Sequence, residues 1–90
     1  FKIMNRIENN KIYTETENGK KIEFEVILTF KNENNEKNYV VYTDNSYDNN
    51  NKLRIYASIY NPDNLQFIGN PDTKEEWNII YNLLDKTLLN

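Results

Sequence analysis

The sequence predicts an α+β fold: an antiparallel β-meander of four to five strands with one C-terminal α-helix packed on one face. Apolar and polar residues alternate over residues 22–30, which is the period of a strand with one buried face. From residue 77 onward, apolar residues recur every three or four positions, which is the period of an amphipathic helix. We expect this helix to cover the apolar face of the sheet, since no other large apolar surface is predicted.

The first predicted strand covers residues 11–17, which are rich in β-branched residues. Asn18 and Gly19 follow it, and both tolerate the positive φ angles of a two-residue type I′ hairpin turn. Such a turn would place Tyr13 opposite Phe24 as an aromatic cross-strand pair. The second strand is predicted to bury one stripe on a single face, made of Ile22, Phe24, Val26, Leu28 and Phe30.

Polar loops rich in asparagine separate the later predicted strands. Asparagine occupies 18 of the 90 positions and gathers between the patterned segments, which fits its tolerance of turn conformations. The polar loops are residues 31–38 and 44–52. The remaining predicted strands are residues 39–43, 53–60 and 65–68.

The helix is predicted to begin at a capping box. The Thr73 hydroxyl can accept a hydrogen bond from the Glu76 N–H, while the Glu76 carboxylate reaches back to the start of the helix. Trp77 lies on the apolar stripe, where we interpret it as a core residue. The stripe consists of Trp77, Ile80, Tyr81, Leu84 and Leu88.

The length of 90 residues is enough for one modest hydrophobic core. We expect a single α+β domain at residues 11–90, preceded by a frayed N-terminal segment at residues 1–10, where no period is sustained. No apolar run approaches the roughly 20 residues that a membrane-spanning helix needs. No signal peptide is apparent, so a cytoplasmic location is expected.

Composition argues against most catalytic chemistry. The chain has no cysteine and no histidine, so it lacks disulfides, thiolate nucleophiles and the commonest general base and metal ligand. We therefore predict no enzyme activity, no cofactor and no metal. The net charge is −3 and neither half of the chain is basic, so a nucleic-acid partner and a membrane surface are both disfavoured.

Two acidic motifs contain residue types that can form functional sites. Asp44, Ser46 and Asp48 have the spacing that opens an EF-hand calcium loop, but Asn49 and Ile55 occupy the positions that require glycine and glutamate. A solvated loop is the favoured interpretation. The pair Glu23 and Glu25 shares one strand face, where general acid–base chemistry would require burial that the pattern does not provide. We expect lysine or threonine partners from an adjacent strand instead.

The candidate interaction surface is formed by Arg54, Tyr56 and Tyr60. These residues alternate with apolar ones, so they share the face of their strand that the single helix leaves uncovered. Tyr39 or Tyr42 could join them from the neighbouring strand. Exposed aromatic and arginine side chains are enriched at protein interfaces, and the same arrangement can stack single-stranded bases.

Several segments resemble the YrzB-like bacterial family of unknown function (DUF1292). A glycine turn precedes an acidic, aromatic and aliphatic strand at residues 17–26, and Thr29-Phe30 follows it. A Tyr-Val strand lies at residues 39–42, and a Glu-Glu-Trp helix start lies at residues 74–77. The resemblance covers roughly residues 11–89. It implies a small cytoplasmic bacterial protein without an established activity. No catalytic or binding residue is established in the family, so none is carried over to this sequence.

The sequence thus predicts a small non-catalytic protein-interaction or regulatory module. Another protein is the expected partner, and the chain itself is expected to be a monomer or a homodimer. The alternative is a weak single-stranded nucleic-acid binder that uses the same tyrosine and arginine face. An edge strand left open by the meander would also be able to accept a partner strand.

Overall fold

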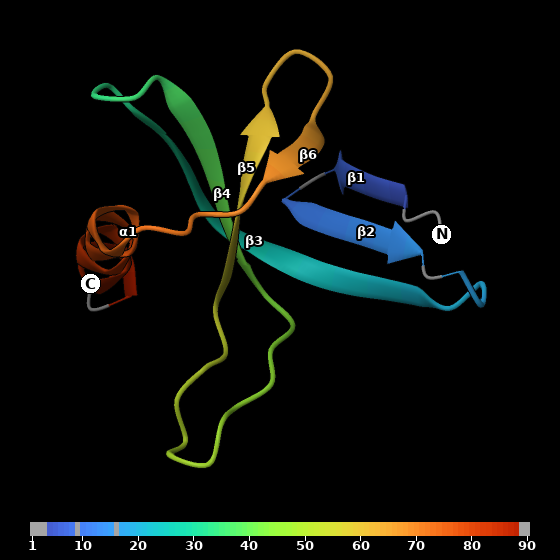
Figure 1. Ribbon diagram of the computed structural model, residues 1–90. Coiled ribbons are helices and arrows are strands. Elements are labelled where there is room, and N and C mark those ends of the chain that lie inside the picture. The colour runs from blue at the N-terminus through green and yellow to red at the C-terminus, as the bar shows by residue number, and fades with distance from the viewer. Residues whose placement is uncertain (1–3, 9, 16, 89–90) are drawn as a thin grey trace.

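The computed structural model describes residues 4–8, 10–15 and 17–88. Within these residues, six strands form one antiparallel sheet in sequence order, and a single helix follows them (Figure 1). This confirms the α+β meander with a C-terminal helix. The elements are β1 Met4–Glu8, β2 Lys11–Glu15, β3 Lys21–Asn32, β4 Lys37–Thr43, β5 Tyr56–Asn61, β6 Gln66–Gly69 and α1 Lys74–Leu88.

The sheet has one strand more than predicted. Residues 1–10 were expected to be frayed, but β1 lies within them and pairs with β2 from Met4–Glu15 to Glu8–Lys11. Strand pairing, rather than a hydrophobic period within β1, places Met4–Glu8, while residues 1–3 and 9 lie outside the described residues. The strand predicted at residues 53–60 also begins later, at Tyr56, where pairing with β4 starts.

The register between β2 and β3 differs from the prediction by one residue. Ile12 lies opposite Phe24, and Tyr13 lies opposite Glu23. Five residues, rather than two, separate the paired ends of the strands, so the predicted Tyr13–Phe24 pair is wrong. Because side chains alternate between faces, this shift buries Ile12 completely in place of Tyr13.

A β-bulge divides the apolar stripe of β3 between the two faces of the sheet. Val26 pairs with Tyr42, whereas Leu28 pairs with Val41, so Ile27 is an extra residue in β3. Tyr42 and Val41 are neighbours in β4 and point to opposite faces. The single apolar face predicted for residues 22–30 is therefore wrong, since residues before and after the bulge face opposite ways.

The main core lies between the sheet and α1, on what we call the helix face. Val41 and Ala57 of the sheet pack against Ile80 and Leu84 of the helix, and all four side chains are buried. Partly buried side chains extend this cluster, among them Ile27, Leu28, Phe30, Ile55 and Trp77. Trp77, Ile80 and Leu84 of the predicted stripe thus pack as expected, whereas Tyr81 is exposed and the Leu88 side chain lies outside the described residues. No helix among the described residues is long and apolar enough to cross a membrane.

The opposite face carries a second apolar cluster, which we call the aromatic face. Its exposed or half-buried rings are Phe24, Tyr42, Tyr56 and Phe67. Tyr42 contacts the other three rings and Phe24 also contacts Tyr56, and the ring centroids of these pairs lie 5.2 to 5.9 Å apart. Ile12 and Val40 are fully buried although no helix covers them. The curl of the sheet explains this burial, because the edge strands β1 and β6 contact each other on the side away from α1 (Figure 1).

Asparagine side chains shape two hairpin turns of the same design. In the β3–β4 turn, Glu36 N donates to the Asn32 carbonyl, and in the β5–β6 turn Leu65 N donates to the Asn61 carbonyl, both at 2.7 Å. Glu36 and Leu65 both adopt a positive φ of 60°. In each turn the first asparagine side chain also accepts a backbone N–H two residues later. The high asparagine content therefore has a local structural use.

Candidate interaction surface

Tyr56 is the central residue of the candidate surface. It begins β5, lies opposite Tyr42 of β4, and has a ring that stacks on Tyr42 with centroids 5.8 Å apart. Phe24 meets the same ring edge-on at 5.8 Å. The Tyr56 side chain remains 37% exposed. One side of the ring is therefore packed against the aromatic face while the rest of the side chain contacts solvent.

The loop between β4 and β5 holds Arg54 beside Tyr56. The Tyr56 hydroxyl donates to Oδ2 of Asp44 at 3.3 Å, and the Ser46 hydroxyl donates to Oδ1 of the same carboxylate at 2.6 Å. Arg54 donates from its guanidinium to Ser46 Oγ at 3.2 Å and from its backbone N–H to the Ser46 carbonyl at 2.9 Å. A continuous hydrogen-bonded chain thus links Arg54 to Tyr56 across this loop.

Tyr60 lies apart from the other two predicted residues. It follows Tyr56 by four positions on β5, which at about 3.3 Å per residue places it roughly 13 Å further along the strand. It is half-buried and lies opposite Asn38 of β4 and Phe67 of β6. The structure therefore brings Arg54 and Tyr56 together, with Tyr60 at the far end of the same face.

The neighbouring strand contributes Tyr42 to this surface but not Tyr39. Tyr42 packs against Tyr56, and its hydroxyl hydrogen-bonds with Ser58 Oγ at 2.9 Å. Tyr39 lies on the helix face instead, where it is 1% exposed and stacks on Phe30. Side chains along β4 alternate between the two faces of the sheet. Tyr39 and Tyr42 are three residues apart, so they point to opposite faces.

Hydrogen bonds define the charge state of the surface. The Ser46 hydroxyl and the Ser46 backbone N–H both donate to Asp44 and lower the pKa of its carboxyl. Burial against the other rings and the adjacent Asp44 charge raise the pKa of Tyr56. At neutral pH the surface therefore carries one anionic carboxylate, one guanidinium and a protonated phenol. This arrangement can bind through apolar contact and hydrogen bonds.

The acidic loop motif does not gather its oxygens around one point. Asp44 accepts hydrogen bonds from Ser46, as described, while Asp48 Oδ1 accepts from the backbone N–H groups of Asn50 and Lys52 at 2.8 and 3.0 Å. In the part of the chain that the structure describes, no group of three or more acidic side chains could hold a metal ion. The loop geometry thus agrees with a hydrogen-bonded turn.

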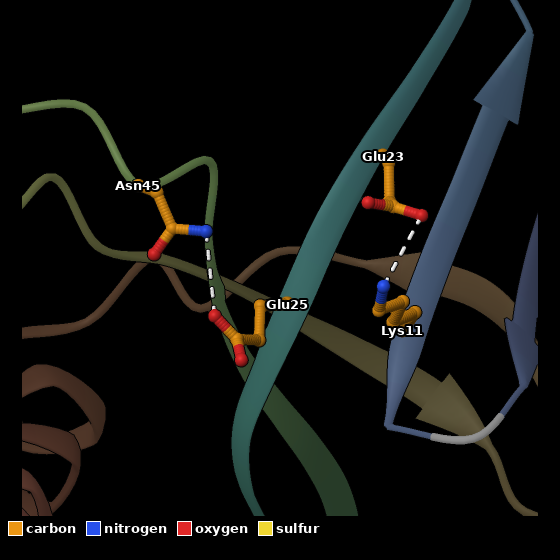
Figure 2. Close-up of polar contacts among 4 residues, drawn as sticks. All are labelled: Lys11, Glu23, Glu25 and Asn45. Carbon is orange, nitrogen blue, oxygen red and sulfur yellow. Dashed lines mark hydrogen bonds and ion pairs between the residues drawn. The ribbon is translucent and has the colours of Figure 1, made fainter.

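The glutamate pair on β3 has ordinary surface partners. Figure 2 shows Glu23 and Glu25 pointing toward different neighbours on either side of the strand. Lys11 Nζ lies 3.5 Å from Glu23 Oε1, and Asn45 donates to Glu25 Oε2 at 3.3 Å (Figure 2). Both carboxylates are exposed, so no desolvation prepares either one for acid–base chemistry.

An open cavity of about 360 Å³ lies between the β3–β4 turn and the start of α1, with Asn35, Lys37 and Thr73 in its lining. Glu76, which is 7% exposed, also lines it. Its Oε1 accepts from Thr73 N at 3.2 Å, and Glu76 N donates to Thr73 Oγ1 at 3.1 Å, which confirms the predicted capping box. Tyr39 donates to Oε2 of the same carboxylate. The buried polar groups here are therefore already paired within the chain.

Sequence reasoning missed the residues that hold the surface in place. The motif of Asp44 and Ser46 predicts a solvated loop in preference to a calcium site, and it gives no sign of a contact with Tyr56, although Asp-x-Ser is a common hydrogen-bonded turn motif. Their positions beside Tyr56 depend on the path of the long β4–β5 loop, where a bridge pairs Tyr47 with Leu53. Phe67 joins the aromatic face through the pairing of β6 with β5, which no local pattern indicates.

Comparison with known proteins identifies the family. A family model described as a protein of unknown function, DUF1292, matches residues 17–88. The chain belongs to this family. A relative, the UPF0473 protein lwe1514 of Listeria welshimeri serovar 6b, is 32% identical over 83 residues, which cover 89% of this chain and 83% of that protein. No solved structure matches the chain significantly. The DUF1292 match includes Arg54, Tyr56 and Tyr60, but its description assigns no role to any residue.

Proposed function

We propose that this DUF1292 protein is a non-catalytic binding module that acts in the cytoplasm and contacts a protein partner through Arg54 and Tyr56, with Tyr60 at the rim. One observation carries the proposal. Tyr56 keeps 37% of its side chain exposed while Tyr42 and Asp44 hold it in one position. An aromatic ring that is both exposed and immobilised is suited to intermolecular contact.

The physical reason is the entropy of binding. Ordering a free side chain at an interface costs about 0.5 to 1.5 kcal/mol, and contacts within the unbound protein remove part of that cost. Arg54 and Tyr56 are both held by the β4–β5 loop before any partner arrives. Tyrosine and arginine are also the residue types most often found at energetic hot spots of interfaces. The two properties together favour this surface over the isolated exposed Tyr47.

The chemistry of the surface defines the partner. The Arg54 guanidinium fits a carboxylate, since it offers several donors in a planar array. The exposed part of Tyr56 fits an apolar or aromatic side chain. We therefore propose a partner segment in which an acidic residue lies next to an apolar one. Such a segment would leave the Asp44 carboxylate at the edge of the contact, where water can solvate it.

Single-stranded nucleic acid remains the less supported alternative. Arg54 could bind phosphate, and Tyr56 could stack on a base. However, one side of the Tyr56 ring already stacks on Tyr42, and the ionised Asp44 lies within hydrogen-bond distance of its hydroxyl. The net charge of −3 also opposes association with phosphate. These observations favour a protein partner.

A site-specific crosslinking experiment tests the proposal. A photoreactive amino acid at position 56 in the tagged full-length chain should capture a defined protein from a lysate of the native host, with and without nuclease. The matched control carries the same group at Tyr47, which is 62% exposed but lies outside the surface. A protein captured from position 56 alone and resistant to nuclease supports the proposal. Capture that disappears with nuclease supports the nucleic-acid alternative.

Affinity measurement with the purified partner completes the test. Tyr56→Ala should weaken binding by at least about tenfold, since hot-spot truncations cost roughly 2 kcal/mol or more. Arg54→Ala should weaken it in a salt-dependent way. Tyr47→Ala should leave the affinity unchanged. Equal affinities for the Tyr56→Ala and Tyr47→Ala variants, both folded by circular dichroism, would overturn the proposed surface.

A further inference from the structure

The turn between β2 and β3 presents an asparagine–glycine pair to solvent. Asn18 and Gly19 are both exposed, and so are Glu17 and Lys20 on either side. Gly19 has a φ of 79°, and nothing lies within 4 Å of the position that a Cβ atom would occupy there. Among the described residues, no hydrogen bond holds the Asn18 side chain. The exposed Asn18 amide therefore lies beside the Gly19 backbone nitrogen with its side chain free to approach it.

Asparagine followed by glycine has a defined intramolecular chemistry. The Gly19 backbone nitrogen, after losing its proton to solvent, can attack the side-chain carbonyl carbon of Asn18. A bond forms between that nitrogen and Cγ, the bond from Cγ to the side-chain nitrogen breaks, and ammonia leaves. Water then opens the cyclic imide at one of its two carbonyls, which yields aspartate or isoaspartate. No oxidant, metal or enzyme is required.

Hydrogen bonds hold the side chains of four asparagines in two other turns. The side-chain oxygens of Asn32, Asn35, Asn61 and Asn64 each accept a backbone N–H, which fixes the amide away from the following nitrogen. Asn61 also precedes Pro62, as Asn70 precedes Pro71, and a proline nitrogen has no proton to lose.

Asn45 is the most instructive comparison. It is followed by Ser46, which is the smallest residue after Gly19 to follow an asparagine in this chain. The Asn45 amide donates to Glu25 at 3.3 Å (Figure 2). The Ser46 nitrogen that would have to attack it already donates to Asp44 at 3.0 Å. Both reacting groups are thus occupied in the folded chain, although unfolding would release them.

We propose that Asn18 is a site of spontaneous deamidation and that the fold favours it over Asn32, Asn35, Asn45, Asn61 and Asn64. The product adds one negative charge to a chain whose net charge is −3. The isoaspartate form also inserts a methylene group into the backbone of the turn. The modified turn joins the paired strands β2 and β3 and lies apart from Arg54 and Tyr56. Deamidation therefore marks aged copies of the protein at a site outside the candidate surface.

Tryptic peptide mapping after prolonged incubation in mildly alkaline buffer tests the proposal. Cleavage after Lys11 and Lys20 releases residues 12–20, in which Asn18 is the sole asparagine, so a mass shift in this peptide reports the site directly. We expect this peptide to convert several-fold faster than residues 38–52, which contain Asn45. The Asn18→Gln variant should remove the shift, since glutamine would have to form a larger ring.

Incubation in concentrated urea separates the effect of the fold from that of the sequence. Unfolding should accelerate conversion at Asn45 far more than at Asn18, because among the described residues hydrogen bonds hold the side chain of Asn45 and not that of Asn18. Equal rates for the two peptides in the folded protein would overturn the proposal. A rate at Asn18 that rises strongly in urea would also overturn it, since the turn would then be protective.

Discussion

The hydroxyl of Tyr39 donates a hydrogen bond to Oε2 of Glu76, and this contact joins β4 to the first turn of α1. Both side chains are buried. Asn35 donates to the Tyr39 oxygen at 3.0 Å, and Thr73 Oγ1 donates to the other Glu76 oxygen at 2.9 Å. The capping residue of the helix therefore also anchors the helix to the sheet.

Removing the Tyr39 hydroxyl should destabilise the fold. Tyr39→Phe leaves a buried carboxylate oxygen of Glu76 without its donor, which costs roughly 1 to 3 kcal/mol. Urea unfolding followed by the fluorescence of Trp77, the single tryptophan, measures the free energy of unfolding. Tyr47→Phe is the matched control at an exposed position. If both variants unfold at the same urea concentration, the contact makes no net contribution to stability.

Stability should fall in acid through Glu76. Burial by itself would raise the pKa of this carboxyl, but hydrogen bonds from Tyr39, Thr73 and the Asp72 backbone outweigh it and lower the pKa. The folded pKa thus lies below the unfolded value of about 4.3. The resulting stability is fully present above that unfolded value and is lost as the pH falls through the folded pKa.

The Glu76→Gln variant isolates this contribution. It should be less stable than the original chain at neutral pH, and the difference should narrow as the pH drops below about 4. Hydrogen bonds from Ser46 lower the pKa of Asp44, and hydrogen bonds from the Lys52 and Asn50 backbone lower the pKa of Asp48. Both residues remain in the two chains, so their contributions to the pH dependence cancel in the comparison. A difference that stays constant from neutral pH to acid would contradict the assignment.

Leu65→Asn should stabilise the protein. Leu65 has a φ of 60°, a left-handed conformation that costs roughly 1 to 2 kcal/mol for most residues but is tolerated by asparagine. The side chain is 40% exposed, so its loss sacrifices little packing. We expect a gain of about 1 kcal/mol in urea unfolding. Leu65→Ala is the control, because it removes the same packing and keeps the unfavourable backbone; a gain there as well would refute the conformational explanation.

Deletion of Ile27 should destabilise the protein and keep its cooperative folding. Val26 and Leu28 would become neighbours and would still pair with Tyr42 and Val41 on opposite faces, so only the bulge and the Ile27 side chain are lost. Loss of that partly buried side chain forfeits up to roughly 1.5 to 3 kcal/mol of burial. Circular dichroism during thermal unfolding provides the measurement. Insertion of one residue after Gly19, in an exposed turn, should be tolerated. A broad, non-cooperative transition in the deletion variant would contradict the assignment of Ile27 as the extra residue.

Local patterns were enough to predict much of the fold. The capping box at Thr73 and Glu76 and the apolar stripe behind it depend on residues three or four apart, so the sequence displays them directly. The antiparallel meander follows similarly from short polar loops between β-forming segments. Of the candidate surface, the exposure of Arg54 and Tyr56 was also predictable from alternation along one strand.

The tertiary structure decided what depends on contacts between distant segments. The bulge at Ile27 exists because β3 must supply apolar residues to two faces, and an unbroken alternation gives no sign of it. The curl that buries Ile12 and Val40 arises from the approach of β1 to β6. The path of the β4–β5 loop likewise brings Asp44 to Tyr56. The sequence by itself determined the elements and their order because these follow from neighbouring residues, whereas register, curvature and the candidate surface required the whole chain to fold.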